Sequence, residues 1–198
     1  MKYALKEWNT TIEALSRGLI VAIWRKGGID DIPNVETPYE SFNVEKEQFI
    51  FFPTFADQNP NKVKNAFWYL FDLNGKPNKD NQIKLKYWAE VEEEITIESL
   101  DQLLNLSKEL ANSEEHLKSS WNLYPNHKGK ILILRVYALS NPVLITNSPE
   151  YGGYKSWIEL KIDIPKAGSK PILPFKEFKQ KLRLLKVYLD QARELIAS

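Results

Sequence analysis

The chain has 198 residues, 43% of them hydrophobic and 27% charged, a composition typical of a globular protein that is long enough to bury a core. Its formal net charge is +1, so no overall field draws it to nucleic acid or to an anionic membrane, and binding of either kind needs a local basic patch. Cysteine is missing from the sequence, which excludes disulfides, thiolate catalysis and cysteine-ligated metals.

The same composition argues against metal or cofactor chemistry and against a membrane location. His116 and His127 are the only histidines, and no carboxylate motif surrounds them, so we expect no metal, no cofactor and no Ser-His triad. No run approaches the roughly 18 apolar residues of a membrane span. The N-terminal stretch carries charges throughout, unlike a signal peptide. We therefore expect a cytoplasmic protein that does not contact a membrane.

The first third of the chain predicts one helix and two strands. Apolar residues at helical spacing predict an N-terminal helix, and they are Leu5, Trp8, Ile12 and Leu15. Gly18 suits the position that follows a helix C-terminus. The apolar run 19–24 predicts a strand that Gly27-Gly28 interrupts, and the run 49–52 predicts a second strand closed by Pro53.

The middle of the chain predicts elements of both kinds. Short helices are expected over 63–70 and 113–121, and another begins after Ser99, which forms a capping box with Gln102. Strands are expected over 87–97 and 131–139, and Asn141-Pro142 ends the second of them. The acidic run 90–94 is interpreted as a solvated edge that discourages strand pairing.

The C-terminal part of the chain shows three successive patterns. Strict alternation over 156–164 predicts a half-buried strand whose buried face holds Ile158, Leu160, Ile162 and Ile164. The segment 165–173 is rich in breakers and predicts a linker. From Pro174 onward apolar residues repeat as heptads, which predicts an amphipathic helix over 174–198 packed on the domain or on a second copy of the chain.

These patterns together predict an α+β fold. Helices and strands interleave irregularly, so we expect a mixed or antiparallel sheet with flanking helices and a long C-terminal amphipathic helix. The predicted organisation is a domain over 1–164, a linker over 165–173 and the helix over 174–198.

Three groups of residues resemble a known family. They read ALKEW…IEAL…G…RKGGI near the N-terminus, then F-x-V…F…PT…Q, and later LRVYAL…GG…SWIEL. Together they resemble the bacterial "domain of unknown function 1802" family, found especially in cyanobacteria, from Ala4 to Leu160. The resemblance implies a small cytoplasmic bacterial protein and no particular activity. Asp57 stands where a histidine is expected, and the helix over 174–198 lies beyond the expected end of the family.

The stretch IVAIWRKGGIDDIPN leads a buried strand into two cations and two glycines. Glycines let successive backbone N–H groups point into one concavity, and Arg25 and Lys26 supply positive charge for a phosphate. The alternative is an ordinary strand end, where both cations stay in water and Gly27-Gly28 turns the chain. Arg25 and Lys26 point to opposite sides of a strand, so they line one pocket only if the turn starts early.

Polar residues near two other strands are further candidates for ligand binding. Thr54, Asp57 and Gln58 follow the apolar strand 49–52; the alternative is that Asp57 or Asn59 caps the next helix. Arg135 interrupts the apolar strand 131–139 and, if buried, needs a carboxylate, a carbonyl or water. It forms a structural ion pair, or it binds an anion together with the arginine of the first strand.

A second glycine pair lies between aromatic residues, in the stretch from Tyr151 to Trp157. Aromatic rings close to cations can stack on exposed nucleobases, so Tyr151, Gly152, Gly153 and Trp157 are candidates for ligand binding. The alternative is that these rings cover an edge of the core.

Glu159 and Lys161 have the carboxylate-x-lysine spacing of many metal-dependent nucleases. On a strand they share a face and could meet a metal and a phosphodiester, with Asp30, Asp31 or Glu13 as the upstream carboxylate. The same spacing arises on any solvent face where charges alternate, a pattern that Asp163 continues.

Three functional hypotheses follow. The leading one is a non-catalytic module that binds a phosphate-bearing ligand, a nucleotide or nucleic acid, near Arg25 to Gly28. The second is a divalent-metal-dependent phosphodiesterase that uses Glu159 and Lys161. The third is an interaction protein that forms a homo-oligomer or binds a partner through 174–198. Whether the protein is an enzyme stays open at this stage.

Overall fold

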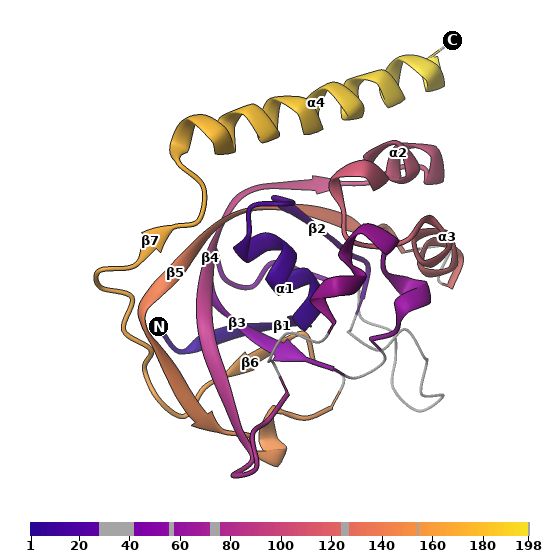
Figure 1. Ribbon diagram of the computed structural model, residues 1–198. Helices are drawn as coiled ribbons and strands as arrows, with labels where there is room; N and C mark the ends of the chain where they lie inside the picture. The colour runs from indigo at the N-terminus through magenta and orange to yellow at the C-terminus, as the bar shows by residue number, and fades with distance from the viewer. Residues whose placement is uncertain (28–41, 56–57, 72–75, 124–126, 154, 198) are drawn as a thin grey trace.

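The structure is a computed structural model that describes residues 1–27, 42–55, 58–71, 76–123, 127–153 and 155–197 (Figure 1). Within these ranges one mixed sheet is flanked by helices, so the predicted α+β class is confirmed. The strands are β1 (Tyr3–Trp8), β2 (Ala22–Arg25), β3 (Gln48–Thr54), β4 (Gln82–Thr96), β5 (Lys130–Thr146), β6 (Trp157–Glu159) and β7 (Lys170–Pro171). The helices are α1 (Asn9–Ser16), α2 (Leu100–Asn105), α3 (Glu114–Leu123) and α4 (Phe175–Ala197), with 3-10 turns η1 (Pro60–Lys62), η2 (Asn65–Leu70), η3 (Leu106–Glu109) and η4 (Pro149–Tyr151).

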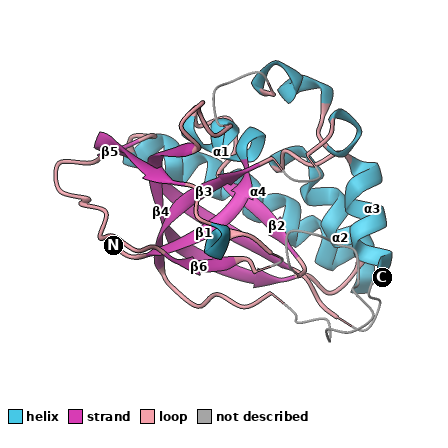
Figure 2. Cartoon of the chain, turned by 90° about the horizontal axis from the view of Figure 1, so that it is seen from below, coloured by secondary structure: helices cyan, strands magenta, loops and turns pink. Residues whose placement is uncertain are grey.

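The sheet has the strand order β2-β5-β4-β3-β1-β6, and β7 pairs with β5 outside this path. β1 and β3 are parallel, and the remaining pairs are antiparallel. The sheet curls into a half-barrel that encloses α1 (Figure 1), and the view from below shows α2 and α3 beside each other next to the strands (Figure 2). β2 and β6, at opposite ends of the order, are the two edges that the curl brings toward each other.

The core has an inner and an outer layer because successive residues of a strand face opposite sides. On β5, Leu132 and Leu134 face the inner cluster, which also holds residues of α1. Ile131 and Ile133 of the same strand face the outer cluster beneath α2, α3 and α4. A third cluster covers the outer side of β1, β3 and β4 and includes residues after β6.

α4 lies across the outer face of the sheet and packs on its own domain, as one of the two predicted alternatives had it (Figure 1). The heptad positions that pack against the outer cluster are buried, and they are Phe178, Leu182, Leu185 and Leu189. Leu184, which lies next to these buried heptad positions, is 45% exposed. Among the helices in the described ranges, none has the length and apolar character needed to cross a membrane.

The acidic run 90–94 is not a sheet edge, and this prediction is wrong. β4 lies in the interior of the strand order, between β3 and β5. A register shift between Val91 and Glu93 interrupts the β4–β5 ladder at this point. Two of the glutamates form ion pairs with lysines of α4: Glu92 with Lys179 at 2.6 Å and Glu93 with Lys186 at 2.8 Å. The negative charge of the run therefore complements the basic face of the helix.

Several local signals are confirmed. Gly18 has φ +63° and follows α1, where the left-handed conformation favours glycine. Ser99 accepts a hydrogen bond from the Gln102 backbone N–H at 3.2 Å and caps α2. Asn59 caps η1 by accepting from the Asn61 N–H at 2.8 Å.

The predicted N-terminal helix is partly wrong, because residues 3–8 form β1. Leu5 and Trp8 continue the spacing of Ile12 and Leu15 by coincidence: the first two lie on the strand and the second two on α1. β1 pairs with β3 on one side and β6 on the other, and this pairing overrides the helical pattern of the sequence.

Two predicted strands also have different ends. β5 continues through Pro142. The β4–β5 register is irregular here, between the pair Tyr87–Ala138 and the pair Leu85–Val143. Proline is tolerated in such a bulge because its position needs no N–H for the ladder. The strand expected over 156–164 ends at Glu159, and Ile162 is 46% exposed instead of buried. The segment 165–173, predicted as a linker, contains β7, which pairs with β5. The Ile172 N–H donates a hydrogen bond to the Val136 carbonyl at 2.9 Å.

Adjacent leucines of α4 test how strongly this helix is anchored. Leu185 is fully buried, so Leu185→Ala should lower the free energy of unfolding by about 2–5 kcal/mol, through lost apolar burial and a residual cavity. Leu184→Ala, the exposed control on the same turn, should lower it by under about 1 kcal/mol. Urea titrations of both variants measure the difference; equal effects would mean that α4 does not pack as described.

Candidate functional site

The two edges of the half-barrel meet at a cluster of charged and glycine residues that we call the seam. It consists of Lys6, Glu7, Arg25, Lys26, Gly152, Gly153, Lys155 and Ser156. Arg25 ends β2, the first two residues belong to β1, and the last four form the turn that leads into β6. The curl of the sheet therefore brings together three segments that are far apart in the sequence.

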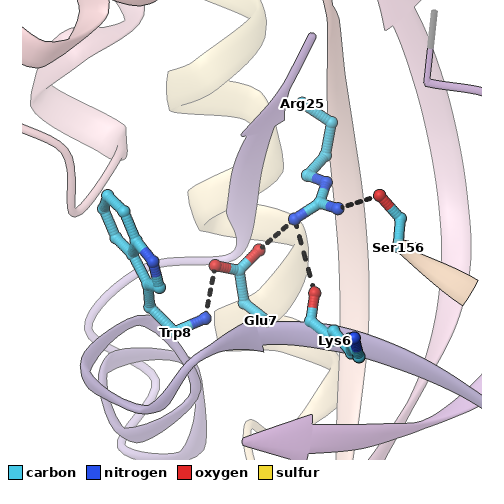
Figure 3. Close-up of polar contacts among 5 residues, drawn as sticks. All are labelled: Lys6, Glu7, Trp8, Arg25 and Ser156. Carbon is cyan, nitrogen blue, oxygen red and sulfur yellow. Dashed lines mark hydrogen bonds and ion pairs between the residues drawn. The ribbon is translucent and has the colours of Figure 1, made fainter. Parts of the chain in front are cut away.

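Arg25 connects these segments directly (Figure 3). Its Nη1 donates to Glu7 Oε2 at 3.2 Å and to the Lys6 carbonyl at 3.4 Å, and its Nη2 donates to Ser156 Oγ at 2.7 Å. Arg25 and Glu7 are both buried, at 6% and 7% exposure, whereas Ser156 is half-buried. The guanidinium thus bridges β2, β1 and the turn before β6, with its Nη2 arm nearest the surface.

Strand alternation explains why this ion pair faces inward. Glu7 lies two residues after Leu5, and Arg25 lies two residues after Ile23; both of those apolar residues belong to the inner core cluster. The guanidinium also lies over the ring of Phe42, 4.9 Å from its centroid. Charged side chains at core-facing positions require a partner, and here each provides it for the other.

Burial dominates the electrostatics of Glu7. Loss of water raises the pKa of its carboxyl above the ordinary value, since the charged form is the one that suffers from desolvation. The positive charge of Arg25 opposes this rise, as do hydrogen bonds from the Trp8 backbone N–H, from Arg25 and from Thr11. The net direction is upward, so the folded protein holds a proton on Glu7 more tightly than the unfolded chain does.

The two buried lysines of the seam, Lys6 and Lys26, point in different directions. Lys6 Nζ donates to the carbonyl oxygens of Gly152 at 3.1 Å and Gly153 at 2.7 Å, which ties β1 to the turn. Lys26 Nζ donates to the Trp121 carbonyl and lies 5.0 Å from that ring centroid. Arg25 and Lys26 therefore diverge, as alternation along a strand predicts, and Gly28 lies outside the described residues.

The second glycine pair lies at the seam, but its aromatic neighbours serve the core. Tyr151 is buried against Phe52, and its hydroxyl accepts from the Lys161 N–H at 3.0 Å. Trp157 packs on Phe42 and Phe49. Gly153 has φ +72°, and a side chain at this position would point into open space.

Thr54 and Gln58 lie next to the seam, at the end of β3. Thr54 is opposite Trp8 in the parallel ladder, and Gln58 Oε1 accepts from the Thr10 N–H at 3.0 Å. Among the described residues, buried polar atoms without a hydrogen-bond partner gather near this point: Trp8 Nε1, Thr10 Oγ1, Arg25 Nε and Thr54 Oγ1. Asp57 lies outside the described residues.

Arg135 is on the opposite face of the sheet from Arg25, so the two do not form one anion site. It shares the outer face of β5 with Ile133, and its guanidinium lies 5.3 Å from the ring centroid of Phe175 and 5.7 Å from that of Tyr137. It lines a small pocket with Phe178 beneath the start of α4.

The nuclease-like pair does not assemble a metal site in the described part of the chain. β6 ends at Glu159, and Lys161 forms an exposed ion pair with Glu150 at 2.9 Å, which raises the pKa of Lys161 through that hydrogen bond and the negative charge. Asp30 lies outside the described residues, and the described residues hold no group of three metal-ligating side chains. The nuclease hypothesis stays a prediction without support from this geometry.

Sequence reasoning missed Glu7, Lys6 and Ser156. The helical interpretation of residues 5–15 hid the signal, which is a glutamate two positions after a core leucine on a strand. No local pattern marks Ser156, because its partner lies 131 residues away.

The protein is therefore an α+β protein whose mixed sheet is curled into a half-barrel, and a buried ion pair between Arg25 and Glu7 connects β2 to β1. The chain belongs to the family described as "Domain of unknown function (DUF1802)", whose sequence model matches residues 4–183. The match is longer than the 4–160 expected from the motifs and includes the first part of α4.

Two solved structures are similar to the chain, both mutant forms of ZmASCH from Zymomonas mobilis. The first has 16% sequence identity and a TM-score of 0.43, and the similarity covers 92% of this chain and 96% of that one. The second has 14% identity and a TM-score of 0.42, and covers 92% and 94%. Similarities at this level carry no argument about function. None of the curated proteins compared with the chain matches it.

The raised pKa of Glu7 makes a testable contribution to stability. A carboxyl with a raised pKa in the folded state stabilises the fold most when it is protonated, so stability should fall as pH rises from the ordinary glutamate value of 4.5 through the higher pKa of the folded state. Urea titrations across this window should show that Glu7→Gln removes that decrease, which reaches at most about 1.4 kcal/mol per pH unit. Glu115→Gln, at an exposed glutamate, should retain it. An unchanged pH profile in Glu7→Gln would contradict the assignment.

Proposed function

We propose that the protein binds a phosphate-bearing ligand, a nucleotide or nucleic acid, at the seam, where the ligand's phosphate contacts the Nη2 arm of Arg25 and the exposed Lys155. The observation that carries this proposal is the position of that arm. It reaches the half-buried Ser156, one residue from an exposed lysine, on a turn that begins with a glycine pair.

The charge of the seam supports an anionic ligand. The residues that define it include four cations, Lys6, Arg25, Lys26 and Lys155, and a single carboxylate, Glu7. Carbonyl oxygens accept hydrogen bonds from two of the lysines, Lys6 and Lys26. Lys155 is exposed and the other three cations are buried, so in this proposal the ligand's phosphate meets Lys155 at the surface together with the Nη2 arm of Arg25.

In this proposal the phosphate docks at the turn before β6. Ser156 Oγ is an acceptor for Arg25 Nη2, and a phosphate oxygen can take the same position, with a stronger charge-assisted hydrogen bond. Open space lies beside Gly153, where a Cβ would meet no atom within 4 Å. In this proposal Lys155 takes the role that the sequence suggested for Lys26, whose Nζ lies against Trp121.

A charge reversal on the turn tests the proposal without disturbing the core. Lys155→Glu should weaken binding of a short oligothymidylate several-fold and reduce the slope of log affinity against log salt by about one, because one phosphate contact is lost. Lys84→Glu reverses an exposed charge on β4 and is the matched control, which should bind like the wild type except for a small nonspecific effect. Fluorescence anisotropy at several salt concentrations measures both.

Two outcomes would contradict the proposed function. One is a wild-type protein that does not bind the oligothymidylate at low salt. The other is equal weakening by Lys155→Glu and Lys84→Glu, which would place binding on the general surface and not at the seam.

A further inference from the structure

We propose that Glu7 makes ligand binding at the seam proton-linked: the phosphate and a proton on Glu7 bind together, so that affinity rises as pH falls. This inference rests on the proposed function, since it concerns the regulation of the same site. It assigns to Glu7 the role of a positioning residue, which acts through Arg25 and does not touch the ligand.

The argument starts from the ion pair. In the free protein Glu7 Oε2 accepts from Arg25 Nη1 at 3.2 Å, and both side chains are buried. A phosphate that reaches Nη2 of the same guanidinium brings a second negative charge to one cation. Two anions close together in a poorly hydrated site oppose each other's ionisation, so the bound phosphate favours the neutral form of Glu7.

Within the described part of the chain, few groups around Glu7 compensate for that second charge; the Trp8 backbone N–H, which donates to Glu7 Oε1 at 2.8 Å, is uncharged. From β2, Arg25 is the charged group that acts on its carboxyl; from α1, Thr11 supplies a hydroxyl hydrogen bond. Further along α1, Glu13 forms an ion pair with Lys86 at 2.5 Å. The turn before β6 presents Ser156 to the arginine and not to Glu7.

The neighbouring strands do not change this balance. Lys6 is next to Glu7 on β1, but its Nζ contacts the Gly152 and Gly153 carbonyls. On β3 the residue opposite Glu7 is Pro53, which has no charge. Arg25 is therefore the group through which a bound phosphate and Glu7 influence each other.

Burial favours the neutral form of Glu7, because it raises the pKa of this carboxyl. A ligand that raises this pKa further binds more tightly to the protonated form, and by reciprocity the proton increases the affinity for the ligand. The proton comes from solvent and forms the O–H bond of Glu7. Arg25 Nη2 exchanges the Ser156 hydroxyl for a phosphate oxygen, while Nη1 stays beside the neutral carboxyl of Glu7. One linked proton limits the change to tenfold in affinity per pH unit.

The experiment uses a ligand that does not titrate in the range studied. Phosphodiesters and thymine keep their charge between about pH 5 and 8, so any change in oligothymidylate affinity over this range comes from the protein. Wild-type affinity should rise as pH falls, by up to tenfold per unit. Glu7→Gln imitates the protonated carboxyl, so it should bind more tightly than the wild type at pH 8 and show a flat profile. Glu115→Gln should behave like the wild type.

A second measurement keeps the inference falsifiable if Glu7→Gln does not fold. Calorimetry of the wild type in two buffers with different ionisation enthalpies should show uptake of a fraction of a proton, up to one, on binding. A wild-type affinity that is independent of pH, or binding without proton uptake, would overturn this inference and leave the proposed function standing, provided that Lys155→Glu still weakens binding. A pH profile that persists in a folded Glu7→Gln variant would also overturn it. If the oligothymidylate does not bind at any pH, both proposals fail.

Discussion

The buried contact of Arg25 with Glu7 and Ser156 holds the half-barrel closed. A curled sheet with the order β2-β5-β4-β3-β1-β6 has one edge at β2 and the other at β6, and Arg25 joins β2 to β1 and to the turn that leads into β6. The backbone ladder ends at these edges, so side chains take over the connection. Removing one partner from a buried ion pair leaves the other charge uncompensated, which typically destabilises a protein by about 3–5 kcal/mol.

The same contact also sets the charge that a ligand would meet in the proposed binding site. Glu7 balances the charge of Arg25 inside the protein, so an anion competes with an internal carboxylate and does not meet a free cation. In the proposed complex the ligand contacts Arg25 at the arm that donates to Ser156, together with the exposed Lys155 on the adjoining turn. Under the two proposals, one guanidinium has both a structural and a binding role, and protonation of Glu7 links the two.

The outer face of the sheet has a separate organisation. The glutamates near the β4 irregularity pair with lysines of α4, and the apolar side of that helix covers β5 and β2. Arg135 belongs to this face, where aromatic rings surround its guanidinium. Arg25 and Arg135, which one interpretation of the sequence placed in a common anion site, lie on opposite faces of the sheet.

The sequence by itself determined the features that depend on neighbouring residues. The heptad side of α4, the caps at Ser99 and Asn59, the glycine after α1 and the apolar strands are visible in it because each arises within a few positions along the chain. It also placed Arg25, Gln58 and the 152–153 glycines among the residues of interest.

Only the tertiary structure decided which of these residues meet. Residues 3–8 pair as a strand, where their spacing alone predicted a helix, because β3 and β6 offer them partners that lie 46 and more positions away. Strand pairing also assigns each side chain to the inner or outer face. Glu7 and Ser156 therefore contact Arg25, whereas Arg135 lies on the opposite face of the sheet. Contacts between segments so distant in the chain leave no periodic signal in the sequence, since their energy arises only when the sheet has closed.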